Sequence, residues 1–172
     1  LSTVVVNPQN PSQVFAGSWG SGLVELQNQA VVEHYDATNS SLQPIENLDY
    51  IRVGGLAFDS EQNLWVVNSG APVPIHMRSP DGNWTELDYS NQIAEVNIGE
   101  MIITETGQKW IILLKGKGLF VFDDNGTPDD IGDDSYRKFS VRDEYGEIIS
   151  NEVYAIAEDH NGTIWLGTNE GV

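Results

Sequence analysis

Short apolar runs alternate with polar turns along the whole chain, a pattern typical of β-strands joined by tight reversals. The apolar runs are rich in Val, Ile and Ala. The turns between them are rich in Asp, Asn and Gly, which tolerate the positive φ angles that tight hairpins require. No long stretch keeps a clean helical period. We therefore predict an essentially all-β chain.

An aromatic residue recurs at one position of this pattern. Phe15, Trp65, Trp110 and Trp165 each follow an apolar run and a polar turn, at intervals of 50, 45 and 55 residues. Repeats of roughly 40–50 residues made of short strands are typical of β-propeller blades, which contain four strands each. The repeat therefore predicts a propeller in which these aromatic side chains pack between neighbouring blades.

The number of repeats predicts only part of a closed ring. About 14 strands are expected, whereas propellers close with roughly four to eight blades of four strands. An open ring exposes apolar faces and strand edges, so we expect the native chain to continue beyond Val172. The predicted organisation is a single partial β-propeller over residues 1–172, with blades at about 1–40, 50–90 and 97–142 and a half blade at about 152–172.

The charge of the chain excludes several classes of partner. The chain has 26 Asp and Glu residues against 8 Lys and Arg residues, which gives a formal net charge of −18. Nucleic acids and anionic membrane surfaces attract proteins through Lys and Arg, so neither is an expected partner. No cysteine is present, which excludes disulfides, thiolate metal sites and thiol nucleophiles. No apolar stretch approaches the ~20 residues of a membrane-spanning helix.

The last repeat carries a resemblance to a known family. Residues 153–172 place an apolar strand, Glu158-Asp159, a turn with Gly162, and then Ile-Trp-Leu-Gly-Thr before a Gly-Val pair. This pattern resembles the repeat of the two-component regulator propeller family. The resemblance implies an extracytoplasmic propeller of a Gram-negative bacterium. Such propellers are often the glycan-responsive sensor half of a hybrid histidine kinase.

Three further segments, at residues 7–23, 52–59 and 122–130, resemble the N-terminal propeller of PorZ-type proteins. The first of these departs from the propeller repeat, because its turn contains Pro8 and Pro11 and lacks Glu-Asp. The resemblance implies a cell-surface accessory of type IX secretion, linked to the attachment of exported cargo to lipopolysaccharide. The expected partners are then a protein or a glycan such as lipopolysaccharide, together with the remaining blades of the same chain.

The turns between second and third strands are the predicted ligand-binding surface, by analogy with other propellers. Trp19 stands out, because its turn is otherwise small and polar and an exposed indole there could stack on a sugar. The alternative is a Trp folded back over the blade edge. Lys115-Gly-Lys117 concentrates two scarce basic residues that could meet an acidic glycan or a lipid headgroup; a solvated turn is the alternative. The candidate ligand-binding residues are Trp19, Asn68, Lys115, Lys117 and Asn169.

An acidic loop is a candidate calcium site. Residues 123–134 hold six aspartates, and calcium takes six to eight oxygen ligands. The candidate ligands are Asp123, Asn125, Asp129 and Asp134. Pro128 stands where an EF-hand requires Gly, and no Glu closes the loop, so a hydrated acidic hairpin is the alternative. Apart from this possible calcium, no cofactor is expected.

No catalytic motif is evident. The three His residues lie in separate repeats, and the chain shows no nucleophile elbow and no phosphate-cradling glycine loop. The turn at residues 159–165 looks like the Asp-box of sialidases, but the arginine cluster that a sialidase needs is missing. We therefore expect a non-catalytic binding scaffold. A periplasmic glycan sensor of a hybrid kinase and a fragment of a glycan-degrading enzyme remain the alternatives.

Overall fold

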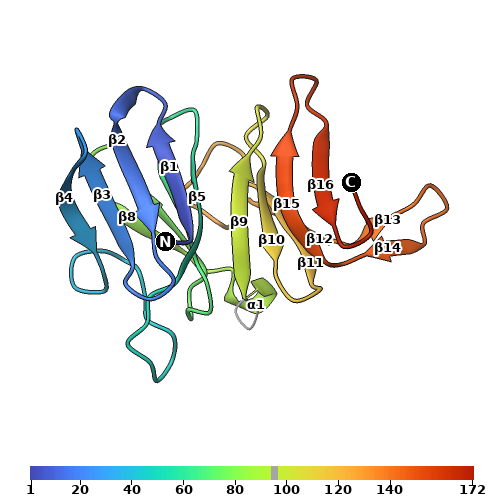
Figure 1. The fold of residues 1–172 in the computed structure, drawn as a ribbon, viewed down its shortest axis with the longest axis horizontal. Helices are drawn as coiled ribbons and strands as arrows, with labels where there is room; N and C mark the ends of the chain where they lie inside the picture. The colour runs from blue at the N-terminus through green and yellow to red at the C-terminus, as the bar shows by residue number, and fades with distance from the viewer. Residues whose placement is uncertain (94–96) are drawn as a thin grey trace.

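The computed structural model describes residues 1–93 and 97–172 and shows a row of antiparallel β-sheets, which confirms the predicted partial propeller (Figure 1). Three sheets have four strands each, and each runs in the simple up-and-down order of a propeller blade. Within the described residues, the one α-helix is the single turn α1 (Ser90–Ile93) after blade 2. None of the helical structure described is long and apolar enough to cross a membrane.

The strands of the first two blades follow the predicted repeat. Blade 1 contains β1 (Thr3–Asn7), β2 (Asn10–Gly17), β3 (Leu23–Gln27) and β4 (Ala30–Tyr35). Blade 2 contains β5 (Val53–Phe58), β6 (Leu64–Asn68), β7 (Ile75–Arg78) and β8 (Trp84–Leu87).

The second half of the chain adds one more blade and two hairpins. Blade 3 contains β9 (Ile98–Ile103), β10 (Lys109–Leu113), β11 (Gly118–Asp123) and β12 (Ser135–Phe139). The last hairpin contains β15 (Val153–Glu158) and β16 (Ile164–Thr168), the first two strands of a further blade. Between them lies a small hairpin that the sequence pattern did not predict, made of β13 (Val141–Arg142) and β14 (Ile148–Ser150).

The anchor aromatics occupy equivalent positions, as their spacing predicts. Each lies in the second strand of its sheet and pairs with a first-strand residue two positions before the turn. The pairs are Phe15 with Val5, Trp65 with Ala57, Trp110 with Ile102, and Trp165 with Ala157. The repeat is therefore structural and not only a coincidence of composition.

The core is formed between neighbouring blades. Because side chains alternate along a strand, β6 points Leu64 and Val66 toward blade 1 and Trp65 and Val67 toward blade 3. Trp65 is fully buried by this packing. Trp165 lies on the face of β16 that is turned away from blade 3, and it is 52% exposed.

Candidate functional site

The blades have two chemically different ends. The end that carries the turns between second and third strands, and the connections from one blade to the next, is called the connection end here. The opposite end, where first strands turn into second strands and third into fourth, is called the hairpin end (Figure 1). The predicted ligand-binding residues belong to the connection end, and the predicted calcium ligands belong to the hairpin end.

Trp19 lies in the β2–β3 turn at the connection end and is 45% exposed. The Ser18 hydroxyl oxygen accepts a hydrogen bond from the Ser21 amide at 2.6 Å, which fixes the turn. The Arg52 guanidinium carbon lies 5.5 Å from the centre of the indole ring, a cation–π arrangement. The indole is therefore held against blade 2 by Arg52 and still presents nearly half of its surface to solvent.

Tyr50 joins this surface, although the sequence analysis did not select it. The amide of Ile51 donates to the Gly20 carbonyl at 3.2 Å, and the Gly22 amide donates to the Ile51 carbonyl at 3.0 Å. This pairing brings the connection between blades 1 and 2 against the Trp19 turn, and the 52% exposed Tyr50 ring lies beside Gly20. We call Trp19, Tyr50 and Arg52 the aromatic platform. The only sequence signal for Tyr50 was an aromatic residue just ahead of a predicted strand.

Lys115 and Lys117 are both exposed in the β10–β11 turn of blade 3. The Gly118 amide donates to the Asn151 carbonyl at 3.0 Å, which repeats the pairing of Gly22 with Ile51 two connections further along. The Glu152 carboxylate lies beside Gly116, between the two lysines in sequence. The basic turn therefore has an acidic neighbour that offsets part of its charge.

The two asparagines of the predicted site differ in exposure. Asn68 is fully buried; its amide group donates to the Arg52 carbonyl at 3.1 Å, and its oxygen accepts from the Gln43 amide at 2.7 Å. Asn68 therefore orders the connection and offers no group to a ligand. Asn169 is exposed, and its oxygen accepts from the Ser150 hydroxyl at 2.6 Å. Among the hydrogen bonds and ion pairs of the described residues, none joins the Trp19 turn to the lysine turn or to Asn169.

The acidic loop does not assemble the predicted calcium site. Asp123 accepts from the Asn125 amide at 3.1 Å, and Asn125 donates to the Asp133 carbonyl at 2.5 Å. Asp134 instead accepts from the Tyr89 hydroxyl, and burial raises the pKa of both groups. In residues 1–93 and 97–172, no three acidic or histidine side chains stand close enough to hold a metal ion. The loop is fixed by turn hydrogen bonds and by Tyr89, so its oxygens do not converge.

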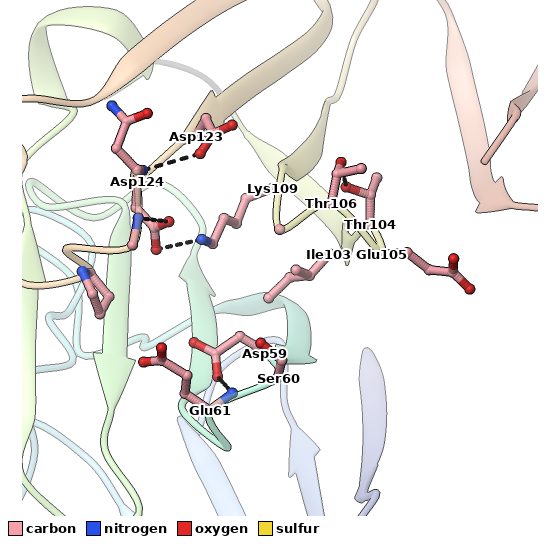
Figure 2. Close-up of a pocket in the computed structure, with 14 residues that line it drawn as sticks. Asp59, Ser60, Glu61, Ile103, Thr104, Glu105, Thr106, Lys109, Asp123 and Asp124 are labelled. Carbon is pink, nitrogen blue, oxygen red and sulfur yellow. Dashed lines mark hydrogen bonds and ion pairs between the residues drawn. The ribbon is translucent and has the colours of Figure 1, made fainter.

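A cavity of about 360 Å³ lies at the hairpin end between blades 2 and 3. Figure 2 shows that Lys109 points into this region toward Asp124, with Asp59 and Glu61 of the β5–β6 turn facing it from blade 2. Lys109 is only 2% exposed and forms an ion pair with Asp124. Its ammonium group lies 4.6 Å from the centre of the Trp65 ring. The cation therefore binds blade 3 to the anchor aromatic of blade 2.

The carboxylate of Asp59 is committed to the structure of the same cavity. One of its oxygens accepts from the amides of Glu61 and Asn63, and the other accepts from the Trp65 indole at 2.8 Å. Asp159 makes the same bond to Trp165 at 2.9 Å, and these bonds lower the pKa of Asp159. In blade 2 and in the last hairpin, Asp and Trp are therefore a structural pair that closes the first hairpin, whereas Trp110 of blade 3 donates to Gln108 instead, at 3.4 Å.

The fold defines the chain as part of a β-propeller, with exposed aromatic and basic side chains at its connection end. Residues 147–170 match the family described as Two component regulator propeller, which confirms the resemblance of the last repeat. None of the curated proteins compared with the chain matches it.

The chain is similar to PorZ, a surface component of the type-IX secretion system of Porphyromonas gingivalis. The two share 30% identity over 98% of this chain, with a TM-score of 0.90, and this chain spans about a quarter of PorZ (24%). It also has the fold of the extracellular domain of a hybrid two component system from B. thetaiotaomicron, with 23% identity over 97% of this chain and 20% of that one, and a TM-score of 0.63. A virginiamycin B lyase from Staphylococcus aureus is 16% identical over 72% of this chain and 36% of that one, with a TM-score of 0.50, which indicates a related fold.

Proposed function

We propose that the chain is a non-catalytic, extracytoplasmic binding module that forms part of a PorZ-type surface component. Its role would be to hold a protein or lipopolysaccharide partner during protein secretion and attachment at the surface of a Gram-negative bacterium. The single observation that carries the proposal is the match to PorZ, which runs over 98% of this chain at 30% identity and a TM-score of 0.90. The extracytoplasmic location rests on the surface and extracellular settings of the two similar structures.

The aromatic platform is the surface best suited to such a partner. Trp, Tyr and Arg are the residues most enriched at energetically dominant positions of protein interfaces. An exposed aromatic face also stacks well on the apolar face of a sugar, and Arg52 stabilises the ring that would do so. The platform lies at the connection end, where the turns and inter-blade connections meet, so a partner could contact two blades at once.

Variants of the full-length protein in its native bacterium test this role. Trp19→Ala with Tyr50→Ala should reduce the amount of cargo retained at the cell surface, measured by fractionation and immunoblotting, while the level of the protein itself stays unchanged. Tyr145→Ala is the matched control, because Tyr145 is an even more exposed aromatic residue (82%) on the β13–β14 turn. Unchanged cargo retention in the double variant would show that the aromatic platform does not bind the partner.

A second candidate function is glycan sensing by a hybrid two-component protein. The observation that favours it is the repeat match at residues 147–170 together with the shared fold of the extracellular sensor domain. Glycan-dependent autophosphorylation of the full-length protein in membranes would support the sensor, whereas cargo loss without any phosphorylation response supports the secretion role. The fold shared with the lyase carries no proposal of catalysis, since identity at that level indicates fold alone.

A further inference from the structure

Lys109 and Asp124 stand in direct contact in the wall of the cavity between blades 2 and 3 (Figure 2). Lys109 begins β10, and Asp124 directly follows the end of β11. Because Lys109 pairs across the sheet with Phe122, the two side chains are diagonal neighbours on adjacent strands. The lysine nitrogen contacts Oδ2 of Asp124, while Oδ1 accepts from the Gly126 amide at 3.3 Å. The antiparallel ladder therefore holds an amine against a carboxyl group.

The pair lies in a poorly solvated region. Lys109 and Asp124 are both buried, and the Trp65 and Phe122 rings, whose centres lie 4.6 Å and 5.9 Å from the lysine nitrogen, exclude water from it. The charges of both residues act on the pKa of Asp134, which burial raises. Loss of water disfavours the charged forms, so a proton can pass from the ammonium to the carboxylate and leave a neutral amine beside a carboxylic acid. A desolvated lysine amine is a nucleophile.

The ion pair between blades 1 and 2 offers a comparison. There a terminal nitrogen of Arg78 lies 3.9 Å from the Glu25 carboxylate. A guanidinium group keeps its proton in proteins and is therefore no nucleophile. Of these two pairs, only Lys109 and Asp124 combine direct contact with a nitrogen that can form a bond to carbon.

We propose that Lys109 and Asp124 condense to form an intramolecular amide bond. The neutral Nζ of Lys109 attacks Cγ of Asp124, and the electron pair of the C=O bond moves to Oδ1, where the Gly126 amide stabilises the charge. The Cγ–Nζ bond forms, the Cγ–Oδ2 bond breaks, and Oδ2 leaves as water with two protons from the lysine nitrogen.

Overall, one ammonium and one carboxylate give one amide and one water molecule, so the reaction needs no oxidant and no activating group. Its main requirement is that the two groups are held together, which the strand pairing of Lys109 with Phe122 provides. Both reacting residues line the cavity of about 360 Å³, through which the water can leave. The bond would fasten the β10–β11 hairpin of blade 3 beside the anchor aromatic of blade 2, and it would persist in denaturant, where an ion pair does not.

Tryptic peptide mapping by mass spectrometry, on the protein purified from its native bacterium, tests the proposal. Trypsin does not cut after an acylated lysine, but it cuts after Lys115 and Lys117, which lie between the joined residues. Residues 79–115 and 118–137 should therefore be recovered as one species, lighter than the two peptides together by one water molecule. Lys109→Arg keeps the positive charge but offers no nucleophile, so it should release these segments separately. Lys117→Met is the matched control, because this lysine is exposed, and it should keep the joined species.

The outcomes are read from the covalent structure and do not depend on the proposed secretion role. A joined species in the parent protein and in Lys117→Met, but not in Lys109→Arg, supports the amide bond. Separate peptides 79–109 and 118–137 of unmodified mass from the parent protein would overturn it. A loss of water confined to peptide 118–137 would also overturn it, because that loss would be a dehydration within the acidic loop without Lys109.

Discussion

The ammonium group of Lys109 lies 4.6 Å above the indole ring of Trp65, the anchor aromatic of the preceding blade. Arg78 has the same relationship to Phe15 one blade earlier, at 5.7 Å. The two cations occupy different strands, since Lys109 pairs across the sheet with Phe122 and Arg78 pairs with Leu64. These two pairs occupy equivalent positions of blades 3 and 2. In blade 3 the second strand carries the cation and the third strand the apolar residue, and in blade 2 the order is reversed. In both blades the cation contacts the anchor aromatic of the preceding blade.

Replacing Lys109 with Met should weaken the fold strongly. Asp124 would be left buried without its partner, and the contact with Trp65 would lose its charge. Breaking a buried ion pair on one side costs about 3–5 kcal/mol in the free energy of unfolding. Chemical denaturation followed by circular dichroism measures the loss.

The double variant Lys109→Met with Asp124→Asn should recover part of this loss, since no unpaired charge remains buried. Lys117→Met, in an exposed turn, is the control and should change the free energy of unfolding by less than about 0.5 kcal/mol. Equal stability of Lys109→Met and Lys117→Met would show that the inter-blade cation does not stabilise the fold.

The fold was predictable because its signals are local and repeated. Each blade carries an apolar run, a polar turn and an aromatic anchor in the same order, so every copy supports the assignment of the others. The β13–β14 hairpin was missed, because its six-residue centre at 142–147 is almost entirely polar and its turn depends on Asp143 accepting from the Tyr145 and Glu147 amides.

The sites were less predictable, since they depend on contacts between blades. Trp19 was selected from its polar turn and is exposed, whereas Asn68 was selected from the equivalent turn and is fully buried. Tyr50 lies in a connection without any hydrophobic period, so only the pairing of Ile51 with Gly20 reveals its place. The six aspartates of the acidic loop suggested convergence, but Tyr89 takes Asp134 away from the rest.

Asp59 and Asp159 offer a matched test of the Asp–Trp pair within one molecule. Asp59→Asn places an amide donor where the buried Trp65 and Asn63 side chains both donate, so the free energy of unfolding should fall by about 2 kcal/mol. In the 172-residue chain Asp159→Asn should cost clearly less, because Trp165 and its hairpin are exposed there. Urea denaturation of both variants measures the difference. If Asp159→Asn lowered the free energy of unfolding as much as Asp59→Asn, or more, burial of the indole would not determine how strongly the Asp–Trp hydrogen bond stabilises the fold.

The stability of the fold should fall in mild acid because of His76. Its Nε2–H group donates to the Val73 carbonyl at 3.1 Å, and Nδ1 accepts from the Ser41 hydroxyl at 2.8 Å. Burial lowers the pKa of His76 from 6.5 to about 4. The unfolded chain therefore binds a proton below about pH 6.5, whereas the folded chain does so only below about pH 4.

The unfolded and folded chains bind equal numbers of protons at His76 above pH 6.5. As the pH falls toward 4, proton binding by the unfolded chain destabilises the fold progressively, by about 3 kcal/mol in total. Urea denaturation between pH 7 and pH 4 measures the slope. His76→Gln should be less stable at pH 7 but should show a flatter profile, while His160→Gln, at an exposed turn, should keep the slope of the parent chain. A parent slope retained in His76→Gln would assign the acid sensitivity to other groups.

Gly22 and Gly118 are expected to be the least replaceable turn glycines at the connection end. Both have positive φ (76° and 78°), and a Cβ atom would fall far inside van der Waals contact of the Tyr35 and Phe139 carbonyl oxygens respectively. Either change to Ala should therefore cost more than the ~1–2 kcal/mol of the left-handed backbone alone. Gly107→Ala isolates that smaller cost, since its φ is 89° and nothing lies within 4 Å of the added carbon. The melting temperatures of the three variants measure these losses. If Gly118→Ala were as stable as Gly107→Ala, the turn would have to shift enough to accommodate the added methyl group without further cost.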